Sequence, residues 1–418
     1  MTRRYISPSE IASMDCWRSY NWKRAGLRPR RSPRALSFGS AWDAFMGEWF
    51  RPIGTLKDVG NGARDERTIT QRLYDSLTAG QEVLDKAKEQ ANAATMALVG
   101  EGLAEVEHEY QEHADMLRGM GEHFAEWFDE DVHGTCRAAQ FRVDVPLRSE
   151  KGTRASTRYS LHGYIDRVME VNGKLVIVDD KTTAGIDDSF HDDFENDLQM
   201  PLYAYGMKLM GYDIGGIAVF AAAKKVPVMP ELRKTLVSVL GDDGEPLTRP
   251  VLDEDGEPVR FKSGARAGEV KTEKVMKPAL RSMLSESGAL NYTTNQTNML
   301  EAIIAHELDV TDYARELEWL REKGSSNFFA LAPVPVSKDM IEEAAHILRS
   351  AGPMLDKIPD VPMRSRFRCK RCQFQTACVE RHPESRADLL KTFYTTREER
   401  RAEADRVAAR QQTQETPA

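Results

Sequence analysis

Hydrophobic and polar positions follow several distinct patterns along the chain. Residues 68–130 are rich in Ala, Leu, Glu, Gln and Lys and contain no proline, which predicts two or more packed helices. From Ala138 onward, β-branched and aromatic residues alternate or form short runs, and they predict three strands with a turn at Asn172-Gly173. A helical pattern at 193–211 and a short strand at 216–225 follow. This order of elements predicts an α/β core.

Weaker signals flank this core. The Ser-Pro-Ser-Glu sequence at 7–10 predicts a helix that begins near Pro8. Two Asp-Gly-Glu-Pro repeats between 241 and 270 predict an inserted pair of turns or a mobile loop, and the C-terminal RQQTQETPA is expected to be disordered. We therefore divide the chain into a helical N-terminal region at 1–135, a core at 136–240, a loop insertion at 241–275, a helical continuation at 276–360 with helices at 297–323 and 337–351, a cysteine-bearing segment at 361–385 and a charged tail at 386–418.

Composition is that of an ordinary soluble protein, with 41% hydrophobic and 30% charged residues among 418. This length permits one elaborated domain with helical additions. No apolar run is long enough to cross a bilayer, and the basic N-terminus lacks the apolar core of a secretory signal, so we expect a cytoplasmic protein with no membrane partner.

Charge is distributed unevenly. The net charge of −8 argues against a surface coated with positive charge for non-specific nucleic-acid binding. Nine Arg and Lys residues nevertheless stand against two acids in the first 35 residues, and a second basic stretch covers 364–371. Either stretch can be simply a solvated face or arm. The alternative is contact with a DNA backbone, for which the candidates are Arg28, Arg30, Arg31, Arg368, Lys370 and Arg371.

Acidic residues and a lysine stand together in the predicted strands. Asp166 ends a Gly-Tyr-Ile-Asp sequence, and one hairpin later comes Val-Asp-Asp-Lys-Thr at 178–182. Since side chains alternate along a strand, Asp179 and Lys181 share a face and Asp180 points away. The turn can bring Asp166 beside Asp179, where two carboxylates can share one cation.

Such a group suits phosphodiester hydrolysis. A carboxylate-bound Mg²⁺ or Mn²⁺ neutralises the phosphate, generates hydroxide from water and stabilises the leaving oxygen, and a lysine adds a donor beside the water or phosphate. Asp-x-Lys by itself is a weak signal, because an exposed strand end produces it by chance.

Downstream residues strengthen the signal. Gln199 and Tyr203 are four residues apart, so they lie on one face of the predicted helix. With them the chain resembles the RecB-like branch of the PD-(D/E)XK nuclease superfamily, whose pattern reads G-x-x-D, an apolar strand ending D-x-K-T, and Q-x-x-x-Y. The resemblance implies a restriction-endonuclease-like α/β core. It also implies a metal held by Asp166, Asp179 and the main-chain carbonyl of Asp180, assistance to the attacking water from Lys181, and a site completed by Gln199 and Tyr203.

The family also carries a helix with a glycine followed four residues later by a metal-binding histidine. Here Gly39 is followed by Asp43, an oxygen ligand that suits a hard cation. Because of this departure, a catalytically weak DNA-binding or assembly protein that retains the fold is the alternative function. His162 and His191 are left out of the site, since isolated histidines are more often surface or packing residues.

Three of the five cysteines form CKRCQFQTAC at 369–378, a C-x₂-C-x₅-C arrangement that can bind one metal centre but lacks a fourth ligand. RecB-like nucleases with an iron-sulphur staple, such as the AddB type and the CRISPR-associated exonucleases, take one cysteine from upstream. The resemblance thus implies a [4Fe-4S] cluster on Cys16, Cys369, Cys372 and Cys378. Zinc is the alternative, although zinc sites usually use two local C-x₂-C pairs. Cys136 is expected to be a buried thiol.

The resemblance implies a Mg²⁺- or Mn²⁺-dependent deoxyribonuclease of the stand-alone exonuclease kind, which serves recombination, repair or CRISPR adaptation and is common in phage genomes. No G-x-x-x-x-G-K-[ST] sequence is present, so any unwinding would need a separate helicase or recombination partner. Trp17, Trp22 and Trp42 can stack on bases, but aromatic residues at helical spacing are more often core.

Overall fold

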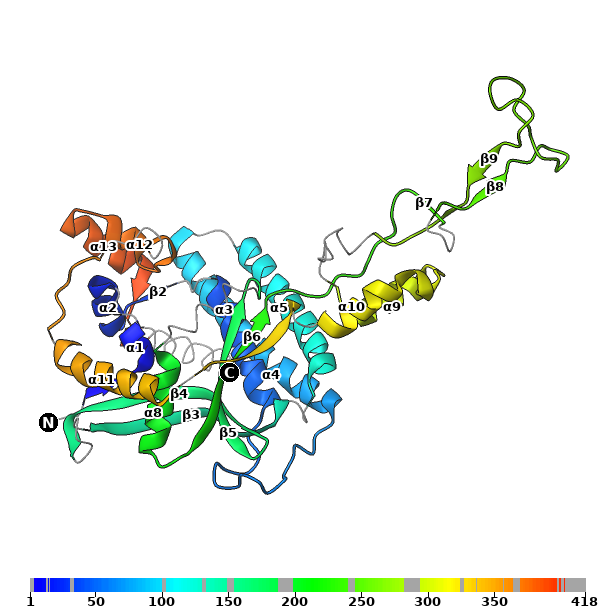
Figure 1. The fold of residues 1–418 in the computed structure, drawn as a ribbon. Helices are drawn as coiled ribbons and strands as arrows, with labels where there is room; N and C mark the ends of the chain where they lie inside the picture. The colour runs from blue at the N-terminus through cyan, green and yellow to red at the C-terminus, as the bar shows by residue number, and fades with distance from the viewer. Residues whose placement is uncertain are drawn as a thin grey trace, which may run out of the picture. The chain divides into compact units, whose positions relative to one another are not determined.

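The computed structural model describes residues 4–12, 14, 16–30, 34–99, 103–129, 133–148, 154–186, 198–239, 245–281, 294–323, 327–335, 337–355, 357–363, 369–396, 398–399 and 402. The chain forms two compact units (Figure 1). Unit 1 comprises residues 1–225 and 328–418, and unit 2 comprises residues 226–327. The expected disorder of RQQTQETPA and most of the predicted charged tail lie outside the described residues.

Unit 1 is built on a six-stranded mixed sheet, which confirms the predicted α/β class. Its order is β1-β4-β5-β6-β11, and β3 also pairs with β4. β5 and β6 run parallel and are joined through a helix, whereas β3, β4 and β5 are antiparallel neighbours. The strands are β1 (Arg4–Ile6), β3 (Thr135–Arg148), β4 (Ala155–Val171), β5 (Lys174–Thr183), β6 (Ile214–Ala223) and β11 (Phe329–Pro333).

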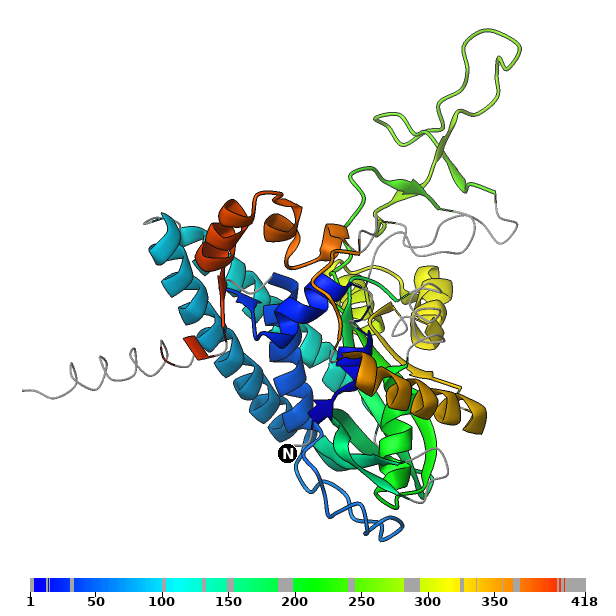
Figure 2. The same ribbon diagram turned by 90° about the vertical axis from the view of Figure 1, so that its left-hand side faces the viewer.

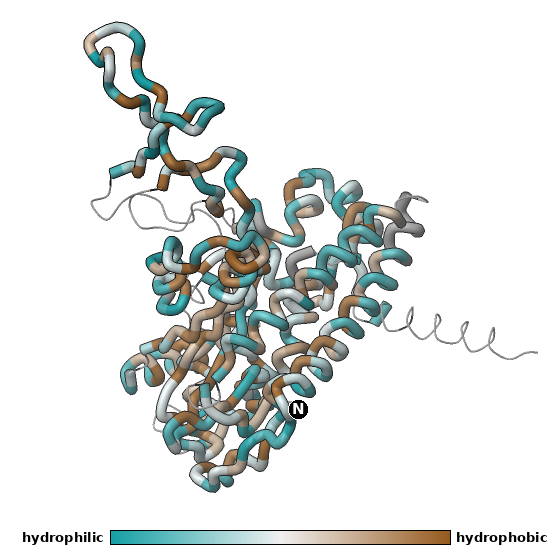
Figure 3. Tube along the Cα trace, turned by 90° about the vertical axis from the view of Figure 1, so that its right-hand side faces the viewer, coloured by the Kyte–Doolittle hydropathy of each residue, from teal (hydrophilic) through white to brown (hydrophobic). Residues whose placement is uncertain are grey.

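Helices cover both faces of this sheet. One face packs against α8 (Gln199–Leu209) and α11 (Lys338–Leu355) through an apolar cluster that includes Leu161, Ile165, Ile177 and Leu202. The other packs against α3 (Arg34–Trp49), α4 (Ile69–Val99) and α5 (Leu103–Trp127). Figures 1 and 2 show α4 and α5 side by side, and Figure 3 shows hydrophobic and hydrophilic positions alternating along them, as in amphipathic helices.

The predicted helical region at 68–130 is thus confirmed as α4 and α5. The predicted helix near Pro8 is α1 (Pro8–Ala12), and the hydroxyl oxygen of Ser7 accepts a hydrogen bond from the backbone N–H of Glu10 at 3.0 Å. No described helix is long and apolar enough to span a membrane.

Segments from the two ends of the chain pack together in unit 1. α2 (Trp17–Arg24) packs with the C-terminal helices α12 (Gln375–Val379) and α13 (Pro383–Phe393) in a small apolar cluster, and η4 (Cys369–Arg371) precedes α12. The Trp22 and Phe374 rings are 5.3 Å apart at the centre of this cluster. β2 (Arg28–Pro29) pairs with β12 (Tyr394–Thr395) beside it.

Unit 2 contains a two-stranded ribbon and a helical cluster. The ribbon consists of two antiparallel pairs. β7 (Val237–Ser238) pairs with β10 (Met276–Lys277), and β8 (Thr248–Pro250) pairs with β9 (Thr272–Lys274). The insertion predicted at 241–275 as a pair of turns or a mobile loop contains β8 and β9, and its described residues also form turns at 254–255 and 265–268. The predicted helix at 297–323 is divided into α9 (Gln296–Ala305), η2 (Val310–Tyr313) and α10 (Ala314–Lys323), which enclose the Tyr313 ring.

Candidate active site

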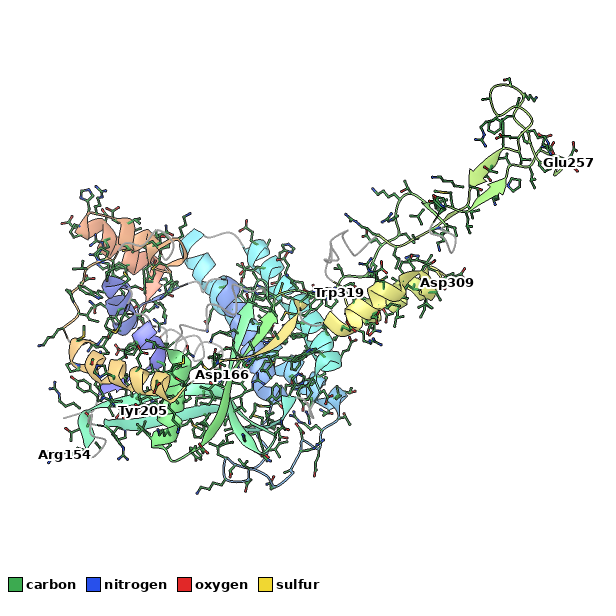
Figure 4. The ribbon with its side chains drawn as sticks, viewed as in Figure 1. Arg154, Asp166, Tyr205, Glu257, Asp309 and Trp319 are labelled. Carbon is green, nitrogen blue, oxygen red and sulfur yellow. The ribbon has the colours of Figure 1, made fainter. Side chains whose placement is uncertain are left out.

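A tight hairpin brings the two predicted strands of the site together. Asn172 and Gly173 form its turn with φ of 51° and 72°, the left-handed conformation that a two-residue hairpin turn requires. The register then pairs Val171 with Lys174 and Arg167 with Val178. The last regular pair therefore leaves Asp166 and Asp179 next to each other, which confirms the predicted hairpin. Figure 4 labels Asp166, near the middle of unit 1.

The acids and the lysine meet at this point. The Lys181 ammonium forms an ion pair with the Asp179 carboxylate, and the backbone N–H of Asp180 donates to Asp166 Oδ2 at 3.0 Å. Gln140 Nε2 is 3.5 Å from Asp166 Oδ1. Asp179 is buried, whereas the Lys181 side chain is 36% exposed. The ammonium group thus lies between a buried acid and solvent, where an anionic substrate can reach it.

Asp180 faces away from this group, as strand alternation predicts. Its carboxylate accepts two hydrogen bonds from the Arg167 guanidinium, one from Nε to Oδ2 at 2.9 Å. Both residues are buried, and the centre of the guanidinium is 4.1 Å from the Phe50 ring centroid and 5.4 Å from that of Phe220. The Asp180 side chain is therefore part of the packing that fixes β4 against β5.

Helix α8 contributes the two downstream residues of the motif. Gln199 Nε2 donates to Asp179 Oδ1 at 2.9 Å, which orients the acid from its other side. Tyr203, one helical turn later, is buried over Gly163, where a Cβ added to the glycine would lie 2.9 Å from the tyrosine ring. The glycine of G-x-x-D thus makes room for the tyrosine of Q-x-x-x-Y.

Replacing Gly163 by alanine is expected to destabilise the protein by about 1–3 kcal/mol, because the new methyl group overlaps the Tyr203 ring. Gly39 is the matched control, since a Cβ there meets only Thr182 Oγ1 at an ordinary 3.5 Å. Alanine within helix α3 is expected to be neutral or stabilising by up to about 1 kcal/mol. Urea unfolding of both variants measures the difference, and equal stabilities would contradict this packing.

Asp43 approaches the same acids from helix α3. Asp43 keeps an exposed surface, but desolvation by the surrounding protein raises its pKa to about 7. The nearby Asp166 and Asp180 add to the shift, and Lys181 opposes it. Burial likewise raises the pKa of Asp179 to about 6, with Lys181 lowering it and Asp166 raising it. The predicted ligand Asp43 is therefore within electrostatic reach of the hairpin acids.

The acids fit a cation by charge, although their oxygens are not arranged around one. Within the described parts of the chain, no set of three or more His, Cys, Asp or Glu side chains is positioned to hold a metal ion. Asp179 instead pairs with Lys181 and Gln199, and Asp166 accepts from the backbone of Asp180. Desolvation and, after it, repulsion between the carboxylates raise the pKa of Asp43 and Asp179, and a divalent cation would relieve this repulsion.

The cysteines predicted to form a cluster lie in the contact between the two chain ends. Cys16 directly precedes α2, and Cys369, Cys372 and Cys378 lie in η4 and α12 or at their ends. Burial raises the pKa of Cys378, and the neighbouring Cys16 and Cys372 raise it further, while Arg18 lowers it. The fifth cysteine, Cys136, is buried as predicted, and burial raises its pKa to about 12.

The structure describes only some of the candidate DNA-contacting residues. Arg28 and Lys370 are exposed, and Arg30 Nη2 donates to the Lys391 carbonyl at 3.1 Å. Arg31 and Arg368 lie outside the described residues, as do His191 and the side chain of Arg371. Trp22 and Trp42 are buried, so these two indoles are core residues.

Two residues at the site were not predicted. Arg167 immediately follows Asp166 and binds Asp180, and Gln140 has φ of 47° where β3 passes Asp166. The available signal for Arg167 was Asp180 on the neighbouring strand, because strand alternation turns this acid away from Asp179 and Lys181, where it needs another partner. We find no comparable sequence signal for Gln140.

Comparison with known proteins agrees with this geometry. The sequence model of the family described as PD-(D/E)XK nuclease superfamily matches residues 5–379. No curated protein matches the chain significantly. The match spans both the hairpin acids and the cysteine segment.

Proposed function

Because the chain belongs to the PD-(D/E)XK nuclease superfamily, we propose that it is a DNA exonuclease that hydrolyses phosphodiester bonds with Mg²⁺ or Mn²⁺. The proposal rests mainly on the meeting of Asp166, Asp179 and Lys181, of which the Lys181 side chain is partly exposed to solvent. The buried Asp179 and the partly buried Asp166, with an adjacent lysine, combine metal-ligating oxygens with a hydrogen-bond donor for an anion.

The residues have distinct proposed roles. Asp166, Asp179, Asp43 and the main-chain carbonyl of Asp180 would hold the metal, which supplies Lewis-acid activation of water and charge neutralisation when bound. Lys181 donates to the attacking water or to a phosphate oxygen. Gln199 orients Asp179, and Tyr203 fixes α8 against Gly163 so that this orientation is kept.

End-labelled linear DNA and covalently closed circular DNA, each with Mg²⁺ or Mn²⁺, test the proposal. We expect the linear substrate to lose nucleotides progressively from an end and the circle to survive. Absence of metal-dependent cleavage would overturn the nuclease proposal. Equal cleavage of the circle would overturn the exonuclease part alone.

A second candidate is a DNA-binding or assembly protein with weak catalysis. The raised pKa of Asp43, in the position where the family carries histidine, is the observation that favours it. Such a protein would bind DNA but show the same slow cleavage in wild-type and Lys181 variants. A lysine-dependent rate excludes it.

We further propose that Cys16, Cys369, Cys372 and Cys378 bind a [4Fe-4S] cluster, as in the RecB-like branch with an AddB-type staple. The effect of Cys16 and Cys372 on the pKa of Cys378 supports this, because it brings an N-terminal cysteine within electrostatic reach of the C-terminal ones, although the described thiols are not arranged around a metal. A cluster would fasten α2 to the C-terminal segment and place the two basic segments around one surface. Zinc on the same thiolates is the alternative.

Metal analysis of protein purified without oxygen distinguishes the two. The cluster predicts a brown protein that contains iron and acid-labile sulphide and bleaches on reduction. A colourless protein with stoichiometric zinc would overturn it in favour of the zinc staple.

In its biological setting, we propose a cytoplasmic, phage-type enzyme of recombination, repair or CRISPR adaptation that works with a separate helicase or recombination protein.

A further inference from the structure

A row of aromatic side chains lies on the sheet next to the site. His162 and Tyr164 share one face of β4, because they are two residues apart, and the alternate residues Leu161, Gly163 and Ile165 are buried. Tyr5 joins the row from β1, which pairs in parallel with β4. Ring centroids are 5.3 Å apart for Tyr5 and His162 and 5.6 Å for His162 and Tyr164.

This row, Tyr5-His162-Tyr164, is open to solvent. Tyr5 is 54% exposed and Tyr164 is 48% exposed, although both are large aromatic residues on a sheet. Their ring planes are inclined by 59° and 83° to that of His162, so the rings do not cover one another by parallel stacking. Ring surface thus remains available to a flat ligand.

The row connects the acids to a basic cavity. At one end, Asp166 follows Tyr164 by two residues along β4, a spacing of roughly 6.6 Å in a strand. At the other end, Tyr5 lines a cavity of about 570 Å³ whose other charged lining residues are Arg4, Lys23, Arg24, Arg28 and a single acid, Glu10. Arg142 stands opposite Tyr164 on β3, where it pairs with Asp144.

We propose that Tyr5, His162 and Tyr164 form a base-stacking subsite for single-stranded DNA, which leads from the basic cavity to Asp166. This inference rests on the nuclease function proposed above and names its substrate class. Exposed aromatic rings beside a positively charged groove are the recurring elements of sites for single strands. In a duplex the faces of the bases are covered by their neighbours, so a duplex cannot use the row in this way.

Fluorescence anisotropy with a labelled single-stranded oligonucleotide in EDTA tests the subsite without cleavage. Tyr164→Ala and Tyr5→Ala are each expected to weaken binding by about 5- to 100-fold, the range for loss of one stacked base. Tyr164→Phe, which keeps the ring, is expected to bind within about 2-fold of wild type. Tyr74, on α4 and 68% exposed, provides the control Tyr74→Ala with unchanged affinity.

A duplex without single-stranded ends is the second probe, and both alanine variants are expected to bind it as wild type does. Wild-type affinity of both variants for the single strand would overturn the subsite, as would an equal loss for the duplex or for Tyr164→Phe. Failure of the nuclease proposal is separate, because it would leave an inactive protein whose single-strand affinity still depends on the two tyrosines.

Discussion

Replacing Lys181 by methionine is expected to lower the single-turnover rate of DNA cleavage by at least about 100-fold, the lower range for loss of a positioned group that moves or stabilises a proton. Lys181 pairs with the buried Asp179 and remains 36% exposed, so its ammonium contacts the acid and stays accessible to an anionic phosphate. Methionine preserves the apolar stem but has no donor. DNA binding measured in EDTA is expected to be retained.

Lys174, at the other end of strand β5, provides the matched control. Lys174→Met removes a lysine from the same strand without affecting the acids, and its cleavage rate is expected to stay within about 2-fold of wild type. The proposed role of Lys181 would be contradicted if Lys181→Met cleaved DNA nearly as fast as the control. It would also be contradicted if the lost activity were matched by lost DNA binding.

Replacing Arg167 by methionine is expected to lower the free energy of unfolding by about 3–5 kcal/mol. Arg167 and Asp180 are buried at 3% and 9% exposure, and the guanidinium packs against the Phe50 and Phe220 rings. Removal of the cation leaves a buried carboxylate without its partner. Urea unfolding measures the loss, and the substitution leaves the carboxylates of Asp166 and Asp179, the proposed metal ligands, unchanged.

The double variant Arg167→Met/Asp180→Leu separates loss of the pair from loss of packing. With both charges removed, we expect at least half of the lost stability to return, because the unpaired buried charge is gone. Lys88→Met is the surface control, since Lys88 pairs with the exposed Glu107 and its loss is expected to cost at most about 1 kcal/mol. A loss for Arg167→Met no larger than this control would contradict the account.

The site was predictable where its geometry is local. Asn172-Gly173 fixes the turn, and strand alternation assigns Asp179 and Lys181 to one face and Asp180 to the other. Helical spacing also placed Gln199 correctly, since its amide reaches Asp179. Each of these inferences uses residues that are close together in the sequence and one regular feature of the backbone: turn geometry, strand alternation or helical spacing.

Contacts between distant segments were not predictable in the same way. β1 and β11 belong to the sheet although they are far from its other strands in the sequence, and neither was expected. The role of Gly163 became clear only from the Tyr203 ring above it. The burial of Trp22 and Trp42 agrees with the expectation that aromatic residues at helical spacing are core, but the exposed rings of Tyr5 and Tyr164 were not expected. The alternation of side chains along a strand does not predict which face a helix distant in the sequence will cover.

Calorimetric titration with Mn²⁺ tests most directly whether the hairpin acids share one cation. If the two acids share one cation, we expect Asp166→Asn and Asp179→Asn each to weaken Mn²⁺ binding by at least about 10-fold, because each removes a charged oxygen ligand. Asp213→Asn, an exposed acid between α8 and β6, is the control with unchanged binding. Wild-type Mn²⁺ affinity in both hairpin variants would contradict the shared site.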